Sequence, residues 1–517
     1  PRSPAAPHPE RTKETMPSTP RRRRFVAGLL LAPLLTGCFA AEGGDASAGG
    51  SEGSRLKVAL AFPPAENFSP YGADATLLSR LGVTEGLTRL DANGVAAPAL
   101  AESWSRENDR GWLFTLRDAA FQDGTEVTPK AVAAALTRAA GADPVTAALS
   151  GVELTAEAAD DGRVRVTTAE PDPALPLRLS SPGLVILSAE AYAEKDAVSP
   201  VGTATGPFEL VKVTGTTAAT LDRYDDYWGG RAQASGVDAR FIADGTARTN
   251  ALRTGEADIA EAVPVSQAAS LDRASRRETA TTRTTSLLLN TRSGALKDPK
   301  ARAAAREAID TSVLAKGVYE GHADSGAGIY GPALTWAADK RVQPAGRAAA
   351  DVTAVAAGQT LTLATYDNRP ELPEVAQVLK QQLEKAGFKV KLQVREYARL
   401  ESDALAGKFN AVVSARNTML DTGDPVSILA GDYTCEGSYN LALLCDEKVD
   451  RAVSAAQSVT DTAKRQDAAM TAEAAILGTD AVVPLVHQRI ITGVGAEVSG
   501  VLLDPYERGL VGVGTRR

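Results

Sequence analysis

The chain has 517 residues, a formal net charge of -8 and 44% hydrophobic residues, which is a globular composition. A single hydrophobic core stops growing at about 250 to 300 residues, so a chain of this length should form at least two lobes. The acidic balance argues against a nucleic-acid partner, and three His and three Cys leave few ligands for a zinc cluster.

The first 37 residues have the pattern of an export signal. Four arginines at positions 21–24 precede an apolar run over residues 25–35, which is too short to cross about 30 Å of hydrocarbon as a mature helix. Leu35-Thr36-Gly37-Cys38 then resembles the bacterial lipobox, which predicts cleavage before Cys38 and a diacylglycerol on its thiol. An ordinary secretory signal with a chance Cys is the alternative. The basic residues fit either Sec or twin-arginine export, and Met16 is the expected start.

Residues 38–54 are rich in Gly, Ser and Ala and show no apolar periodicity, which is typical of a flexible tether. The two or three acyl chains of a bacterial lipoprotein hold a bilayer far more firmly than one chain does. We therefore expect a folded body that is lipid-anchored at the outer face of the cytoplasmic membrane.

Residues 360–415 contain the clearest secondary-structure pattern. Apolar residues alternate at strand spacing, then recur at helical spacing until Gly387, and the same change occurs once more before a final strand. The pattern predicts strands at 361–365, 388–394 and 409–415, with helices at 375–383 and 400–405 between them. Ligands of such βαβαβ sheets bind beyond the carboxyl ends of the strands, so residues 366–369 and 416–424 should share one functional edge.

The N-terminal half predicts a different mixture of strands and helices. Residues 112–116 have the pattern of a strand, and Thr128 and Pro129 have the pattern of an N-cap and first residue of an Ala-rich helix. No motif repeats at a period of 20 to 50 residues, which excludes solenoids and propellers. The fold class is therefore α/β.

Several short motifs occur in an order that resembles one protein family. They resemble the extracellular solute-binding proteins, family 5, that serve peptide and nickel ABC importers, and the resemblance covers about residues 56–510. The motifs are Leu87-Thr88-Arg89-Leu90, Pro98-Ala99-Leu100-Ala101-Glu102-Ser103-Trp104, Phe114-Thr115-Leu116-Arg117-Asp118, Gly206-Pro207-Phe208-Glu209-Leu210, Asp226-Tyr227-Trp228-Gly229-Gly230, Ala251-Leu252-Arg253-Thr254-Gly255-Glu256-Ala257-Asp258-Ile259, and Leu289-Asn290-Thr291-Arg292 with Ala308-Ile309-Asp310.

This resemblance implies a two-lobed fold of the periplasmic-binding-protein type (type II, large peptide-binding class) with a central ligand cleft. The expected parts are lobe I at 55–285, with a subdomain at about 85–200, lobe II at 286–484, and a return to lobe I at 485–517. We expect a monomeric receptor with no cofactor and no metal site of its own. Such a receptor delivers a small peptide or a related charged solute to an ABC permease and ATPase complex.

Residues 421–445 are most similar to the dipeptide-binding branch of this family, through Asp421-Thr422-Gly423-Asp424-Pro425 and Gly437-Ser438-Tyr439-Asn440. The similarity implies that Asp421 holds the α-ammonium of a ligand. It also implies that Arg369, which opens the pair Arg369-Pro370, holds the ligand carboxylate. A buried zwitterion needs one counter-charge at each end, and a guanidinium suits a carboxylate.

Four more residues on this edge are candidate ligand contacts, namely Arg416, Asn417, Asp424 and Tyr366. The branch usually has a Trp where this chain has Thr418, and Arg416 would suit a second carboxylate from an acidic side chain or a metal chelate. The structural alternatives are that Asp421 and Asp424 order a turn, and that both arginines form ordinary surface ion pairs.

Cys435 and Cys445 are the only cysteines after Cys38, in a chain that is expected to reach an oxidising exterior. This setting predicts a disulfide, whose short loop contributes roughly 3 kcal/mol by loop closure. Zinc binding is the alternative, although the sequence places no His or further Cys nearby.

The sequence does not favour catalysis. Gly49-Gly50-Ser51-Glu52-Gly53 matches a nucleophile-elbow string but lies in the predicted tether, and His322 and His487 stand alone in the sequence. We therefore expect a substrate-binding lipoprotein that captures peptides. A nickel or metal-chelate receptor is the second interpretation, and an exported hydrolase or a sensory or adhesion lipoprotein comes after it.

Overall fold

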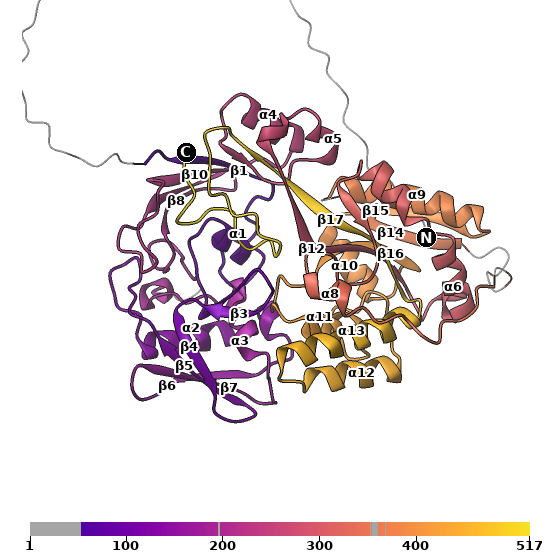
Figure 1. Ribbon diagram of the computed structural model, residues 1–517, viewed down its shortest axis with the longest axis horizontal. Coiled ribbons are helices and arrows are strands. Elements are labelled where there is room, and N and C mark those ends of the chain that lie inside the picture. Colours follow the sequence, from indigo (N-terminus) through magenta and orange to yellow (C-terminus); the bar gives the residue numbers. More distant parts are fainter. Residues whose placement is uncertain (1–52, 195–196, 352, 354–359, 368) are drawn as a thin grey trace, which may run out of the picture. The chain divides into compact units, whose positions relative to one another are not determined.

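The computed structural model describes residues 53–194, 197–351, 353, 360–367 and 369–517 (Figure 1). The predicted signal peptide, Cys38 and nearly all of the tether lie outside the described residues. Within them, no helix combines the length and apolar character that crossing a membrane requires.

A mixed sheet of eleven strands runs through the described chain in the order β15-β14-β16-β12-β17-β11-β1-β10-β9-β8, and β13 pairs with β17. Its two longest strands, β12 and β17, pair antiparallel in the middle of the sheet (Figure 1). The strands are β1 (Leu56–Leu60), β8 (Phe208–Thr214), β9 (Ala218–Arg223), β10 (Gly236–Phe241), β11 (Ile259–Ala260), β12 (Arg276–Leu289), β13 (Ala323–Ser325), β14 (Thr360–Tyr366), β15 (Lys389–Arg395), β16 (Ala411–Asn417) and β17 (Val482–Val494).

The predicted βαβαβ unit is confirmed. It consists of β14, α9 (Glu371–Lys385), β15, α10 (Tyr397–Leu405) and β16, and β14 pairs parallel with both other strands. Gly387 follows α9 with a φ of 98°, which glycine tolerates without strain. The carboxyl ends of β14 and β16 therefore meet at one edge, as expected for parallel neighbours.

The N-terminal segment forms a two-stranded and a four-stranded sheet, and α2 (Pro129–Ala140) packs on the four-stranded one. The predicted strand and helix start are confirmed, because residues 112–116 lie in β5 and the Thr128 side chain accepts a hydrogen bond from the Ala131 N–H at 3.2 Å. The strands are β2 (Thr88–Leu90), β3 (Ala96–Pro98), β4 (Ala101–Arg106), β5 (Gly111–Leu116), β6 (Leu154–Ala158) and β7 (Arg163–Thr168).

The remaining α-helices lie either before β12 or between β12 and β17 in the chain. They are α1 (Ala75–Arg80), α3 (Leu175–Arg178), α4 (Gly245–Arg253), α5 (Val265–Ala268), α6 (Pro299–Glu307), α7 (Thr311–Val313), α8 (Thr335–Asp339), α11 (Pro425–Tyr433), α12 (Glu447–Gln457) and α13 (Thr462–Gly478).

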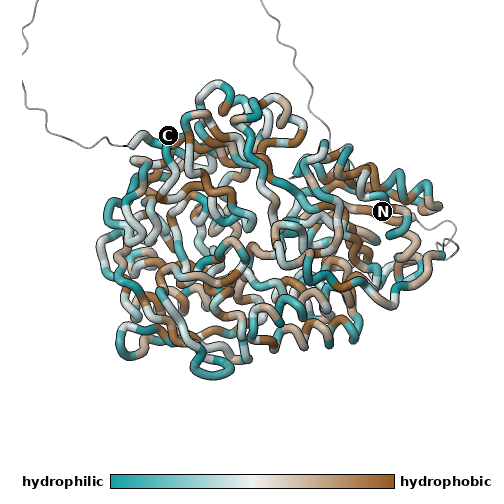
Figure 2. Tube along the Cα trace, in the orientation of Figure 1, coloured by the Kyte–Doolittle hydropathy of each residue, from teal (hydrophilic) through white to brown (hydrophobic). Residues whose placement is uncertain are grey.

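Buried apolar side chains gather in three main clusters. One contains Leu363, Leu379 and Val413 and takes most of its members from residues 287–486. A second contains Leu56 and Leu221 and includes Val498, Leu510 and Val511 from the end of the chain, and a third packs α2 on the four-stranded sheet. Hydrophobic and hydrophilic stretches accordingly alternate along the chain (Figure 2). The boundaries of the lobes remain a prediction.

His487 is buried in β17 and should make stability depend on pH. Its Nδ1 lies 2.9 Å from the Thr284 hydroxyl oxygen, and its Nε2 accepts a hydrogen bond from the Ala327 N–H at 3.2 Å, which a neutral ring satisfies. Burial and nearby Arg341 lower the pKa of His487 to about 4. The His487 imidazole therefore binds a proton less readily in the folded protein than in the unfolded chain.

We expect the free energy of unfolding to fall by about 3 kcal/mol as the pH falls from about 6.5 to 4. In that range His487 binds a proton in the unfolded state but not in the folded state. His487→Gln should be less stable at neutral pH but should lack this dependence on pH. Urea unfolding at several pH values measures it. Parallel pH profiles for the two proteins would contradict the assignment.

Candidate ligand-binding site

The candidate residues lie at the carboxyl ends of β14 and β16, but they do not share one cavity. Cavity A, of about 500 Å³, is lined by the segment after β1, by β12 and β17, by the loop after β14, and by residues 502–510. Cavity B, of about 990 Å³, is lined by residues 145–152 and by β16, α11 and the loop that follows α11. Arg369 lines cavity A, whereas Asp421 and Arg416 line cavity B.

Arg369 is half-buried in cavity A, and its guanidinium forms no ion pair or hydrogen bond with any residue that the structure describes. The guanidinium carbon lies 5.8 Å from the centre of the Phe62 ring. Burial acts against its charge, but the carboxylate of Glu507 and other nearby groups raise the pKa of Arg369 overall. A charged fork of five N–H donors therefore faces the cavity with its hydrogen-bonding capacity unused.

Glu507 is the centre of a buried charge network beside Arg369. It accepts two hydrogen bonds from Arg283 of β12, at 2.9 and 3.0 Å, and one from the Asn417 amide at 3.0 Å. Arg80 of α1 lies 3.4 Å from the same carboxylate and also bonds Glu261. Although burial opposes ionisation, these arginines lower the pKa of Glu507 to about 2. Glu507 therefore stays ionised and joins segments that lie far apart in the sequence.

Arg416 in cavity B is already paired. Its Nε lies 3.0 Å from Asp432, its Nη2 lies 3.2 Å from Asp421, and its guanidinium carbon lies 4.6 Å from the centre of the Tyr439 ring. Burial opposes its charge, but Asp432 and Asp421 raise the pKa of Arg416 well above its usual range. An ammonium group that binds Asp421 would therefore compete with Arg416.

Asn417, Asp424 and Tyr366 are buried and line neither cavity. The Asn417 amide bonds the Thr282 hydroxyl, the Tyr506 carbonyl and Glu507. Asp424 caps α11 and forms an ion pair with Arg465, and the Tyr366 hydroxyl bonds the backbone N–H and C=O of Ala415. In this structure their polar groups hold the edge of the sheet together.

Sequence reasoning missed Glu507, Arg283 and Arg80. A charged residue near a chain end is normally solvated, so nothing in the sequence marks Glu507 as buried. The expected return of the chain to lobe I was the one available signal, because a returning segment has to pass the lobe boundary. Arg508 next to it is also buried and donates to the carbonyls of Ser180, Met419 and Leu420.

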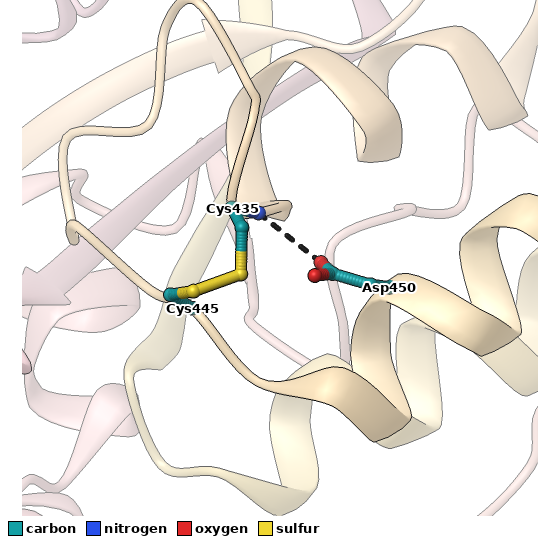
Figure 3. Close-up of side chains that lie close together, drawn as sticks. All are labelled: Cys435, Cys445 and Asp450. Carbon is teal, nitrogen blue, oxygen red and sulfur yellow. Dashed lines mark hydrogen bonds between the residues drawn. A yellow bond between two sulfur atoms is a disulfide. The ribbon is translucent and has the colours of Figure 1, made fainter.

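The predicted disulfide is confirmed between Cys435 and Cys445, with an S–S distance of 2.04 Å (Figure 3). The Cys435 N–H donates to a carboxylate oxygen of Asp450 at 3.1 Å, which ties the bonded loop to α12. Because the two sulfurs are bonded to one another, they offer no thiolates to zinc.

Comparison with known proteins gives one family and a consistent fold. The model of the bacterial extracellular solute-binding proteins, family 5 Middle, matches residues 96–440. The glutathione-binding protein GsiB of Shigella dysenteriae is 26% identical over 467 residues, which cover 84% of this chain and 90% of that protein.

Among solved structures, NikA from Staphylococcus aureus in complex with Ni(L-His)2 has a TM-score of 0.75 at 19% identity and covers 90% of this chain and 100% of its own. DppA from Helicobacter pylori in complex with the peptide STSA has a TM-score of 0.74 at 20% identity and covers 90% of this chain and 98% of its own. These likenesses confirm the predicted two-lobed fold of the periplasmic-binding-protein type.

Proposed function

Because the chain belongs to family 5 of the bacterial extracellular solute-binding proteins, we propose that it captures a peptide outside the cell and delivers it unaltered to an ABC permease and ATPase complex. Two of the similar proteins described above have peptide ligands in their names or titles, glutathione for GsiB and STSA for DppA. The proposal includes a lipid anchor on Cys38, which would keep the receptor close to its permease.

The observation that carries this proposal is the unpaired guanidinium of Arg369 in cavity A. Ligand cavities typically measure about 300 to 1,000 Å³, and cavity A, at about 500 Å³, lies within that range. A peptide carboxylate could accept two parallel hydrogen bonds from one guanidinium. Phe62, Leu502 and Leu503 line the same cavity and are more than a third exposed, so they offer apolar contacts to a bound peptide.

We assign the remaining candidate residues to two roles. In this proposal the ligand reaches from cavity A into cavity B, where its ammonium displaces Arg416 from the pair described above and binds Asp421. Arg416 then turns to Asp432 alone, while Asn417, Asp424 and Tyr366 act indirectly, because they position the strand ends that carry the charged residues. Closure of the lobes over the ligand would supply the form that the permease recognises.

Arg369→Met is expected to weaken binding of glutathione or of the peptide Ser-Thr-Ser-Ala on the order of 100-fold, because a charge-assisted pair to a carboxylate is lost. Calorimetry with wild type and variant measures the change. Arg489→Met is the matched control, since Arg489 lines the same cavity but already pairs with Asp324, and it should have little effect.

The second arm of this experiment uses peptides with an amidated C-terminus. Amidation should weaken binding to the wild type by about as much as Arg369→Met does, and it should have no further effect on the variant. Equal affinities of both peptide forms for the wild type would contradict the role of Arg369. Mass spectrometry of the recovered peptide distinguishes a receptor, which returns it intact, from an exported hydrolase, which cleaves it.

A metal chelate is the second candidate ligand, since a carboxylate of a nickel-histidine complex would fit the same guanidinium. The likeness to NikA with Ni(L-His)2 favours including this complex in the ligand panel. If nickel with histidine binds and displaces the peptide, the metal chelate becomes the preferred assignment.

A further inference from the structure

A third cavity, cavity C, of about 170 Å³, lies between the N-terminal segment and helices α8, α11 and α13. Three of the four tryptophans of the chain line it, namely Trp104, Trp112 and Trp336. Pro176, Leu177 and Met419 add apolar walls. This cavity therefore has a largely aromatic and apolar lining.

One indole N–H and the one charged side chain of these walls already have partners. The Trp112 indole N–H donates to the Asp172 carbonyl at 3.3 Å, which leaves apolar ring surface for the cavity. Arg465 is the charged residue of the lining, and its guanidinium pairs with Asp424. A charged guest would lose its hydration without gaining an unpaired counter-charge among the described lining residues, so the cavity favours a neutral guest.

The walls are also held in place. The Trp336 ring packs on the Tyr330 ring with 5.7 Å between their centres. Arg508 donates to the carbonyls of Met419 and Leu420 at 2.8 and 2.7 Å, which fixes the loop that carries Met419. A cavity with fixed walls spends little binding free energy on reorganisation.

We infer that cavity C binds a single neutral aromatic ring. An apolar cavity of about 150 Å³ is large enough for benzene, and aromatic rings gain further from edge-to-face contacts with one another. The ring belongs either to a side chain of a captured peptide or to a free small molecule. Residues 94–96 and 173–177 form one wall and Trp336 and Met419 another, so the guest contacts both of these walls at once.

Cavity C is separate from the sites assigned to peptide charges. Residues 418–422 form a common partition, since Met419 lines cavity C while Thr418, Asp421 and Thr422 line cavity B. Arg369 lies in cavity A and not in the lining of cavity C. The aromatic site therefore does not depend on the role proposed for Arg369.

Fluorine NMR with fluorobenzene as the probe tests this inference on the purified full-length protein. The wild-type protein should broaden the fluorine signal of the probe, and this broadening should be saturable. Leu177→Trp fills the cavity and should weaken binding of the probe at least tenfold. Ala96→Phe fills the cavity from another wall and should do the same. Val201→Trp is the control for Leu177→Trp. It adds a tryptophan at an exposed position outside the three cavities and should leave binding of the probe unchanged.

Melting temperatures establish that the blocking variants are folded. Absence of saturable binding to the wild type, or unchanged binding to both folded blocking variants, would overturn the inference. Two tripeptides then identify the source of the ring. If a phenylalanine-containing tripeptide displaces fluorobenzene and its alanine analogue does not, the ring is a peptide side chain; if neither displaces it, the guest is a free aromatic molecule.

Discussion

Asp424→Asn is expected to lower the free energy of unfolding by about 3 to 5 kcal/mol, because it leaves the Arg465 charge buried without a counter-charge. The two carboxylate oxygens of Asp424 accept hydrogen bonds from Arg465 at 2.8 and 2.7 Å, and Asp424 is fully buried while Arg465 is 7% exposed. Asn preserves the size of the side chain and its ability to cap α11, so the substitution removes chiefly the charge. Chemical denaturation followed by circular dichroism measures the loss.

Asp461→Asn is the matched control for this substitution. Asp461 also caps a helix, α13, through a hydrogen bond from the Lys464 N–H at 2.9 Å, but its side chain is exposed. Asn and Asp are similar N-caps, so we expect a change of less than about 0.5 kcal/mol. If both variants lose the same stability, the Asp424–Arg465 pair has no special role in the fold.

Much of the fold was accessible from the sequence because its signals are local. The strands and helices of residues 360–417 follow from apolar periodicity and from Gly387, and their shared edge follows from the parallel pairing of β14 and β16. The disulfide followed similarly from two cysteines in an oxidising setting. These features depend on neighbours in the chain or on composition.

The division of the candidate residues between two cavities could not be predicted from the sequence. Successive side chains of a strand point to opposite faces, but the sequence does not show which cavity lies at which face. Arg416 lines cavity B, whereas Asn417 contacts Glu507, which lines cavity A. The sequence placed Asp421 and Arg369 on one edge without showing that they face different cavities. The partners of Arg416 and Asn417 also depend on long-range packing, since Glu507 is 90 residues from Asn417.

Glu507→Gln is expected to lower the free energy of unfolding by about 3 to 5 kcal/mol at neutral pH. The substitution leaves Arg283 and Arg80 beside a neutral amide and removes the charge that attracts Arg369. Glu497→Gln is the control, because Glu497 pairs with Arg517 at the surface and is 76% exposed at its side chain, so its loss should be below about 1 kcal/mol.

The pH dependence of this difference tests the electrostatic origin of the loss. The folded-state pKa of Glu507, about 2, lies below the value of about 4.3 for an unfolded Glu, so its contribution is complete above that value and declines as the pH falls toward 2. The gap in unfolding free energy between wild type and Glu507→Gln should therefore narrow between pH 5 and pH 3. A gap that stays constant over this range would mean that the substitution disturbs packing, and that the arginines around Glu507 contribute no net charge stabilisation.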